Sequence, residues 1–283
     1  AQLGLHFDLT VPFARYVLDN ANDLAFPFKR YQIQKSWRGE RPQAGRFREF
    51  TQADIDVVGL DVLPFVFEVE IALVMAEVLE ALPIGEFRIG VNNRKVSQGI
   101  YESLGIEDVE GTLRIVDKLA KIGADGVTAE LAGIGVSTEQ AAGALRAAEI
   151  TGSTSEEIRA AVSALGVTSE QLAEGLDELS RVLDAAARRV PGRVIADLSI
   201  ARGLDYYTGT VYEATLVGHE SFGAICAGGR YDSLVSDGKR TYPGVGLSLG
   251  VSRLVSKIIA DGEVRASRPV PTAVLVAVTA VRE

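Results

Sequence analysis

Two stretches of alternating polar and apolar residues predict a pair of neighbouring β-strands. Residues 30–37 (RYQIQKSW) and 50–58 (FTQADIDVV) both have the period of two that a half-buried strand requires. The loop between them is rich in Gly, Pro and Arg and is longer than a tight hairpin turn. We therefore expect an antiparallel pair with a long connection.

The spacing of apolar residues predicts further helices and strands along the chain. Residues 63–82 predict a helix with an apolar stripe at Val66, Val69, Leu73 and Val78. Small residues at 244–250 lead into a helix that carries Arg253. More strands are predicted at 87–93, 193–200, 210–217 and 272–280.

The middle of the chain has a different composition. Residues 102–190 contain no Phe, Tyr or Trp, and alanine dominates them. One helix there has a leucine stripe at Leu172, Leu176, Leu179 and Leu183. Capping boxes, in which a hydroxyl and a later Glu or Gln satisfy backbone N–H groups, predict three helix starts: Ser137 with Gln140, Ser153 or Thr154 with Glu157, and Thr168 with Gln171.

We accordingly expect an α+β protein in which an antiparallel sheet, flanked by helices, is interrupted by an all-helical insertion. The expected core comprises 1–96 and 191–268, with the insertion at 97–190. Residues 269–283 would be a linker and the first strand of another domain. The chain begins with neither Met nor a lead-in helix, so we expect it to be a fragment.

Composition and charge narrow the functional classes. A chain of 283 residues with 47% hydrophobic residues predicts a soluble protein with a large core. Its formal charge of −9 argues against a nucleic-acid-coating surface, so RNA would need a local basic patch. No apolar run approaches the ~18–20 residues of a membrane helix. Cys226 has no disulfide partner, and His6 and His219 are too few for a structural His/Cys zinc site, so we predict no metal ligands.

The second predicted strand carries polar side chains on one face, at Gln52, Asp54 and Asp56. The Cα atoms of Gln52 and Asp56 would stand roughly 13 Å apart, which is room for a small polar molecule lying along the strand. A solvated sheet face is equally compatible with this pattern.

Arginines cluster beside that strand, at Arg38, Arg41, Arg46 and Arg48. Guanidinium groups grip phosphates and carboxylates in pairs of hydrogen bonds, so the cluster favours an anion site. The alternative is a set of surface ion pairs with Glu40 and Glu49. Arg202 and Arg253 strengthen the first interpretation. Because neither GxGxxG nor GxxxxGK[ST] occurs, a nucleotide would have to be held by arginine side chains.

Tyrosines lie near these arginines, at Tyr206, Tyr207 and Tyr231, and offer flat faces with one hydrogen bond each. Core packing is their competing explanation. We expect His6 to be packed or solvated, and Cys226 to be a small buried filler with no nucleophilic role.

Four ordered stretches together resemble the catalytic core of the histidyl-tRNA synthetase family, a class II aminoacyl-tRNA synthetase family. They are FDLTVPFARY (7–16), WRGERPQAGRFREFTQADIDVVG (37–59), ARGLDYYTGTVYEA (201–214), and AGGRYDSLV with GVGLSLGVSRL (227–254). The resemblance implies the sheet and the insertion described above. It also implies that the family's first motif lies upstream of Ala1, and that most of an anticodon-binding domain is absent.

The resemblance implies residue roles as well. Asp8 and Thr10 match residues for the α-amino group of histidine, and the histidine pocket would comprise Gln52, Asp56, Tyr206, Tyr207 and Tyr231. Arg38 matches the arginine that orients the ATP α-phosphate and the amino-acid carboxylate. Arg202 matches a histidine-specific arginine that takes part in amino-acid activation at the α-phosphate. Arg253 matches the γ-phosphate arginine, and Glu40 and Arg46 match loop residues near ATP.

The implied activity is that of a histidine–tRNA ligase, which forms histidyl-adenylate from L-histidine and ATP, with Mg²⁺, and then charges tRNA(His). A cytoplasmic homodimer with no membrane partner is expected. Two alternatives stay open at this stage. One is a non-catalytic, histidine-sensing paralogue that regulates histidine biosynthesis, disfavoured because Arg202, Tyr206 and Tyr207 are all present. The other is a non-catalytic RNA-binding module, disfavoured by the acidity of the chain.

Overall fold

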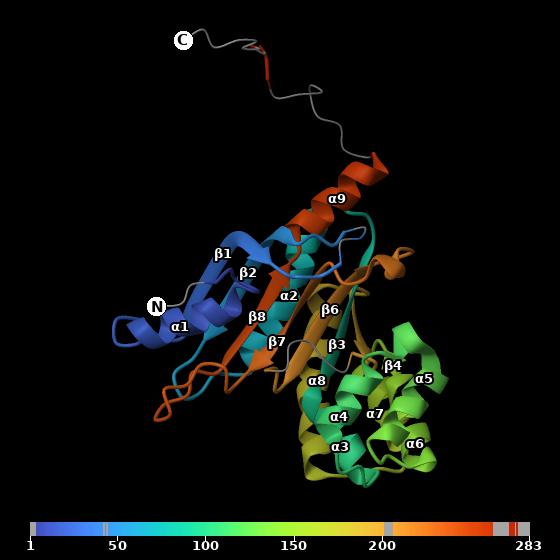
Figure 1. Ribbon diagram of the computed structural model, residues 1–283. Helices are drawn as coiled ribbons and strands as arrows, with labels where there is room; N and C mark the ends of the chain where they lie inside the picture. The colour runs from blue at the N-terminus through green and yellow to red at the C-terminus, as the bar shows by residue number, and fades with distance from the viewer. Residues whose placement is uncertain are drawn as a thin grey trace.

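The computed structural model describes residues 4–41, 43, 45–200, 206–262, 272–274 and 276 (Figure 1). The strands are β1 Phe28–Trp37, β2 Glu49–Val58, β3 Phe87–Asn93, β4 Thr151–Gly152, β5 Val194–Asp197, β6 Thr210–Leu216, β7 Cys226–Tyr231 and β8 Gly244–Leu249. The helices are α1 Thr10–Asn20, α2 Val66–Glu80, α3 Arg94–Ser103, α4 Val109–Val116, α5 Leu119–Gly133, α6 Thr138–Ala148, α7 Ser155–Ser163, α8 Glu170–Arg189 and α9 Val251–Asp261, with a 3-10 turn, η1, at Glu220–Phe222.

The strands form a single sheet in the order β1-β2-β8-β7-β6-β3-β5-β4. Neighbouring strands are antiparallel except β3 and β5, which run parallel. The sequence predicted an antiparallel sheet flanked by helices, and this is confirmed with one parallel pair added. The parallel pair arises because the whole of α3–α8 separates β3 from β5, and a long crossover returns the chain in the same direction.

Helices α2 and α8 cover one face of the sheet, while α3–α7 form a group beside it (Figure 1). The leucine stripe predicted in α8 is buried, as are its neighbours on the same face. One continuous apolar cluster joins this helix to the sheet and to α2. The divisions at 96/97 and 190/191 stay predictions. The strand predicted at 272–280 falls largely on residues that are not described.

The predicted stripe of α2 is wrong. Val66 is 59% exposed, and Val69, Leu73 and Val78 are only partly buried. The buried face consists of Glu68, Ile71, Ala72, Met75, Ala76 and Leu79. Apolar residues surround most of this helix, so their spacing alone does not identify the side that meets the sheet.

Two of the three predicted capping boxes are present, at Ser137 with Gln140 and at Thr154 with Glu157. The third is wrong, because Ser169 caps α8 and accepts the backbone N–H of Leu172. Gln171 donates its side-chain amide to Gln98 in α3, a tertiary contact that the local motif could not reveal.

A buried charge cluster ties α2 to the central strands. Glu68 is 1% exposed and accepts a hydrogen bond from the hydroxyl of Thr210 in β6. Its other oxygen lies 2.8 Å from the Arg230 guanidinium in β7, which also contacts Asp232 at 3.0 Å. Burial raises the pKa of Glu68, whereas Thr210 and Arg230 oppose that shift. Arg230 therefore compensates a carboxylate that would otherwise be costly to bury.

Replacing Arg230 with Met should destabilise the fold strongly. It leaves the Glu68 charge buried without its guanidinium, and we expect a loss of about 3–5 kcal/mol in the free energy of unfolding. Arg15→Met is the matched control, because Arg15 and Asp19 form an exposed pair, for which we expect a loss below ~1 kcal/mol. Urea denaturation followed by circular dichroism measures both. Equal losses would contradict the compensating role of Arg230.

Candidate active site

A cavity of about 350 Å³ opens over the middle of the sheet, where β2, β8 and β7 lie side by side. It brings together every predicted site residue that the structure describes: Asp8, Thr10, Arg38, Glu40, Arg46, Gln52, Asp56, Tyr206, Tyr207, Tyr231 and Arg253. Arg202 lies outside the described residues. The individual roles assigned to these residues stay predictions.

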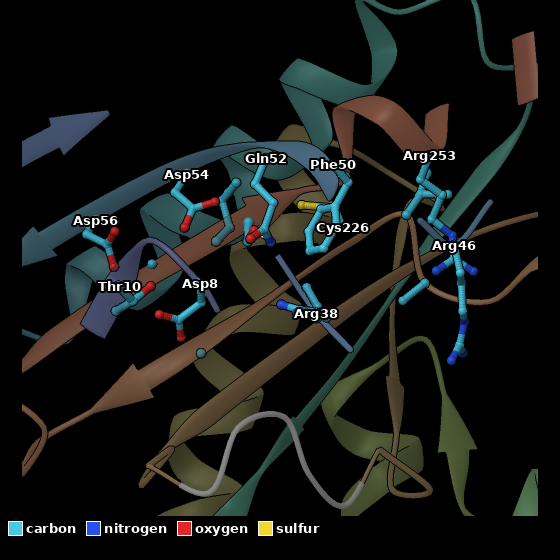
Figure 2. A pocket seen from close by; sticks show the side chains of 18 of the residues that line it. Asp8, Thr10, Arg38, Arg46, Phe50, Gln52, Asp54, Asp56, Cys226 and Arg253 are labelled. Carbon is cyan, nitrogen blue, oxygen red and sulfur yellow. The ribbon is translucent and has the colours of Figure 1, made fainter. Parts of the chain in front are cut away.

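One end of the cavity is acidic. Asp8, Asp54 and Asp56 are only 5%, 2% and 2% exposed. The guanidinium of Arg30 in β1 lies 2.6 Å from the Oδ2 atom of Asp56. In the part of the chain that the structure describes, Arg30 contacts this group of three buried carboxyl groups through Asp56, and Figure 2 shows the three on the same side of the pocket as Thr10. Such an end is suited to a ligand with positive charge or with N–H donors.

Burial dominates the protonation of this end. It raises the pKa of Asp54 to about 7, opposed by a hydrogen bond from Ser248 and reinforced by the charge of Asp56. It also raises the pKa of Asp56 to about 6, opposed by Arg30 and by a hydrogen bond from Tyr231. Both carboxyl groups therefore resist ionisation more than an exposed carboxyl group does, and a bound cation would favour their charged forms.

Aromatic rings and a glycine position Asp56. The hydroxyl of Tyr231 donates to Asp56 Oδ1 at 2.9 Å. Tyr206 packs edge-on against Tyr207 and Tyr231, with ring centroids 5.0 and 5.8 Å away. A Cβ atom on Gly246 would lie 2.3 Å from Asp56 Oδ1, so β8 must have glycine there for the carboxylate to fit. This group of three rings and a carboxylate forms a compact polar and aromatic subsite.

The opposite end of the cavity is basic (Figure 2). The Arg38 guanidinium lies over the rings of Phe7 and Phe50, at 4.7 and 5.1 Å from their centroids. Its Nε atom donates to the carbonyl oxygen of Phe7 at 3.2 Å. Two rings and one backbone carbonyl hold the group, so it is oriented before any ligand arrives.

Arg253 and Arg46 extend the basic end. Arg253 lies 4.7 Å from the centroid of Phe222, and its Nε atom is buried without a hydrogen-bond acceptor among the described residues. Burial lowers the pKa of Arg253, and the nearby charge of Arg46 adds to that effect. Arg46 has Glu40 as a partner, at 3.5 Å. An anion would relieve the mutual repulsion of these guanidinium groups.

The structure tests two competing explanations of the sequence pattern, a solvated face on β2 and surface ion pairs for the clustered arginines. The polar face of β2 is not solvated, because Gln52, Asp54 and Asp56 are each at most 8% exposed. Of the proposed surface ion pairs, Glu40 does meet Arg46, while Glu49 accepts from Lys35 and Trp37.

The ring of His6 lies 6.5 Å from the ring of Trp37, and Cys226 is buried at the cavity wall, where burial raises the pKa of its thiol.

Sequence reasoning missed several residues that shape the site. Asp54 was assigned to the correct face but to no function, although its alternation with Gln52 and Asp56 was a usable signal. Arg30 and Ser248 lie on strands that pair with β2, and nothing local distinguishes them. Phe222 in η1 packs against the Arg253 guanidinium in α9. The two residues are distant in the sequence, so only the tertiary structure reveals this contact.

A second cavity, of about 750 Å³, adjoins the first. It lies between the sheet and the α4–α5 connection, and Arg38 and Glu40 line both cavities. Its other walls include Arg88, Asp197 and Glu213.

No described helix is both long and apolar enough to span a bilayer.

Comparison with known proteins identifies relatives of the chain. A family model described as histidyl-tRNA synthetase matches residues 1–254. Curated histidine–tRNA ligases from Micrococcus luteus and Cutibacterium acnes are 61% and 57% identical, over 99% and 98% of this chain and 61% and 62% of their own lengths. The chain thus spans about three fifths of each of these relatives.

Solved structures have the same fold. A histidyl-tRNA synthetase from a Nostoc species is 41% identical and superposes with a TM-score of 0.83, covering 94% of this chain and 62% of that one. A Bacillus halodurans protein described as an ATP phosphoribosyltransferase regulatory subunit/histidyl-tRNA synthetase has a TM-score of 0.73 at 21% identity, over 89% of this chain and 64% of that one. At that identity the likeness concerns the fold alone.

Replacing Asp54 with Asn should stabilise the ligand-free protein at high pH. Because the folded-state pKa is raised from 3.8 to about 7, the contribution of Asp54 to stability is present below pH 3.8 and lost as the pH rises through 7. We expect Asp54→Asn to gain roughly 1–3 kcal/mol at pH 8 and clearly less at pH 5. Urea denaturation at both pH values measures this.

Asp19→Asn is the control for that substitution, since Asp19 is exposed and its change should alter stability by less than ~1 kcal/mol at either pH. A gain from Asp54→Asn that is equal at pH 5 and pH 8 would contradict the burial of an ionisable carboxyl group.

Proposed function

The chain belongs to the histidyl-tRNA synthetase family, and from this premise we propose that it forms the amino-acid-activating part of a histidine–tRNA ligase. The carrying observation is the division of one cavity into an acidic end at Asp8, Asp54 and Asp56 and a basic end at Arg38, Arg46 and Arg253. L-Histidine offers an ammonium group and ring N–H donors to the first, and its carboxylate and the ATP phosphates are anions for the second.

The proposed reaction joins two anions. The histidine carboxylate attacks the α-phosphorus of ATP, a carboxyl oxygen–phosphorus bond forms, and the α–β bridging bond breaks to release pyrophosphate. Arg38 would orient the carboxylate and the α-phosphate, and Arg253 and Arg46 would hold the outer phosphates. Fixed guanidinium groups lower the barrier by bringing the reactants together and neutralising developing charge. Arg202 keeps its predicted role at the α-phosphate.

Histidine selection would depend on the acidic end. Asp56 would accept a ring N–H, while Tyr207 and Tyr206 would enclose the ring and Thr10 and Asp8 the α-amino group. A ligand of similar size without ring nitrogens would bring no hydrogen-bond donor to the buried Asp56, and such a loss is costly. Mg²⁺ enters this proposal as the ion that accompanies the nucleotide polyphosphate.

Later steps and assembly are also proposals. The 3′ adenosine of tRNA(His) would take histidine from the adenylate and release AMP, with the second cavity as its route because it shares Arg38 and Glu40 with the first. A homodimer is supported by the sheet edge at β1, where Tyr31 and Ile33 are 81% and 66% exposed. We propose the cytoplasm as its compartment and 97–190 as a separate insertion domain.

Histidine-dependent exchange of labelled pyrophosphate into ATP tests the activity in the full-length protein. We expect robust exchange with histidine and none above background without it, because the exchange requires formation of the adenylate. Histidine binding without exchange would overturn the ligase proposal and favour a regulatory paralogue. The 55–61% identity to curated histidine–tRNA ligases supports the ligase over that paralogue.

Asp56→Asn and Arg253→Met should separate the two ends of the cavity. We expect Asp56→Asn to raise KM for histidine at least tenfold with KM for ATP within twofold, because only the ring acceptor changes. Arg253→Met should do the reverse, because it removes a phosphate contact. Steady-state exchange kinetics measure both constants, and thermal unfolding verifies folding. Equal increases in both constants in either variant would contradict the division.

A further inference from the structure

We propose that Arg30, which lies on β1 behind the cavity, makes the ring subsite accept a neutral side chain with an N–H donor and reject a cationic one. Arg30 is a positioning residue in this proposal, because it acts on the ligand through Asp56. The inference rests on the proposed function, since it concerns which amino acid the same cavity accepts. It assigns a task to a residue that the proposed mechanism does not use.

Strand pairing brings Arg30 to Asp56. The two residues are direct partners in the antiparallel ladder of β1 and β2, so their side chains project from the same face of the sheet. Arg30 Nη2 lies 2.6 Å from Asp56 Oδ2, and the two side chains are 8% and 2% exposed. Asp56 lines the end of the cavity away from Arg253 (Figure 2), whereas Arg30 does not line the cavity. The guanidinium therefore reaches the carboxyl group from behind, where an entering ligand does not displace it.

Three further contacts hold the Arg30 guanidinium in this position. Its Nη1 atom donates to Gln32 Oε1 at 2.9 Å, and its Nη2 atom donates to the carbonyl oxygen of Leu9 at 3.2 Å. The guanidinium carbon lies 4.4 Å from the centroid of the Phe13 ring in α1. Contacts with β1, with the residue before α1 and with α1 itself thus keep the cation beside Asp56.

Stability alone does not explain the Arg30–Asp56 pair. Taking two charges out of water costs about as much as their attraction returns, so a buried ion pair is seldom more stabilising than apolar side chains of similar volume. Arg30 Nε is also buried without a hydrogen-bond acceptor among the described residues, and such a donor is costly. The benefit that offsets this cost therefore lies in the cavity that Asp56 lines.

The pair determines which charge Asp56 can receive. The hydroxyl of Tyr231 donates to Oδ1, and Arg30 meets Oδ2. A carboxylate has about four lone-pair sites, so it can still accept one N–H from a neutral imidazole. A ligand ammonium in the same place would lie across one carboxyl group from Arg30, in a buried site that screens their repulsion weakly. Arg30 thus leaves Asp56 as an acceptor and removes its attraction for a second cation.

Two amino acids separate these effects by isothermal calorimetry on the full-length protein at pH 8. L-Histidine has a neutral ring at this pH, because the pKa of an unperturbed imidazole is about 6.5. L-Ornithine has a charged side-chain nitrogen that is as many bonds from Cα as Nε2 is in histidine. Burial raises the pKa of Asp56 to about 6, so its carboxyl group is also ionised at pH 8.

Arg30→Met should change the ratio of the two dissociation constants at least tenfold in favour of ornithine, because Asp56 then lacks its cation. Arg30→Lys keeps a cation and should keep the ratio within threefold of the wild type. Lys29→Met is the matched control, because it removes one positive charge from the neighbouring residue, which pairs with Glu70 on the opposite face of β1. The control should leave both affinities within twofold.

Thermal unfolding verifies that each variant is folded. Arg30→Gln, which is polar and uncharged, takes the place of Arg30→Met if that variant is unfolded, and the same change of ratio is expected from it.

The outcomes separate this inference from the proposed function. An unchanged ratio in Arg30→Met, or an equal loss of both ligands, would show a merely structural role and overturn the inference. The same change of ratio in Lys29→Met would assign it to net charge and would also overturn it. In both cases the ligase proposal stands if the wild type exchanges pyrophosphate with histidine. A wild type that does not bind histidine would overturn the proposed function, and the inference with it.

Discussion

The separation of opposite charges within one water-poor cavity is the constraint on which the site depends. Three carboxyl groups at one end and three guanidinium groups at the other are costly to hold close to their own kind. Burial raises the pKa of Asp54 and lowers the pKa of Arg253, and the like charges of Asp56 and Arg46 add to these two shifts. A zwitterionic amino acid lying beside a polyphosphate would relieve both ends at once.

The sheet is what keeps the two ends apart. β2 lies between β1 and β8, so Arg30 reaches Asp56 from one side and Ser248 reaches the Gln52 amide from the other. Arg38 follows β1 directly, and Arg253 lies in the first turn of α9, the helix after β8. The strands set the distance between the carboxyl groups of β2 and the guanidinium groups of the basic end. The two sets of charges therefore stay apart and do not neutralise each other by direct contact.

Supporting contacts lie behind the charged groups. Phe7, Phe50 and Phe222 hold guanidinium planes, and Gly246 leaves room for a carboxylate. The buried Glu68–Arg230 pair connects α2 to the strand that carries Tyr231. These contacts fix the orientation of the charged groups before a ligand binds.

The sequence by itself indicated β1, β2, β3, β5 and β6, the long helices α2 and α8, and the arginines of the cavity, because alternation, apolar periodicity and clustered arginines are local signals. It did not indicate β4, β7 or β8, and Asp8 and Thr10 were assigned only through the family resemblance. Its errors, the stripe of α2 and the cap of α8, occurred where several apolar or hydroxyl residues were locally equivalent. Only the tertiary structure decided which of them is buried, and only it brought Arg30, Ser248 and Phe222 to the site. Pairing between distant strands leaves no periodic trace in the chain, so those partners could not be predicted from it.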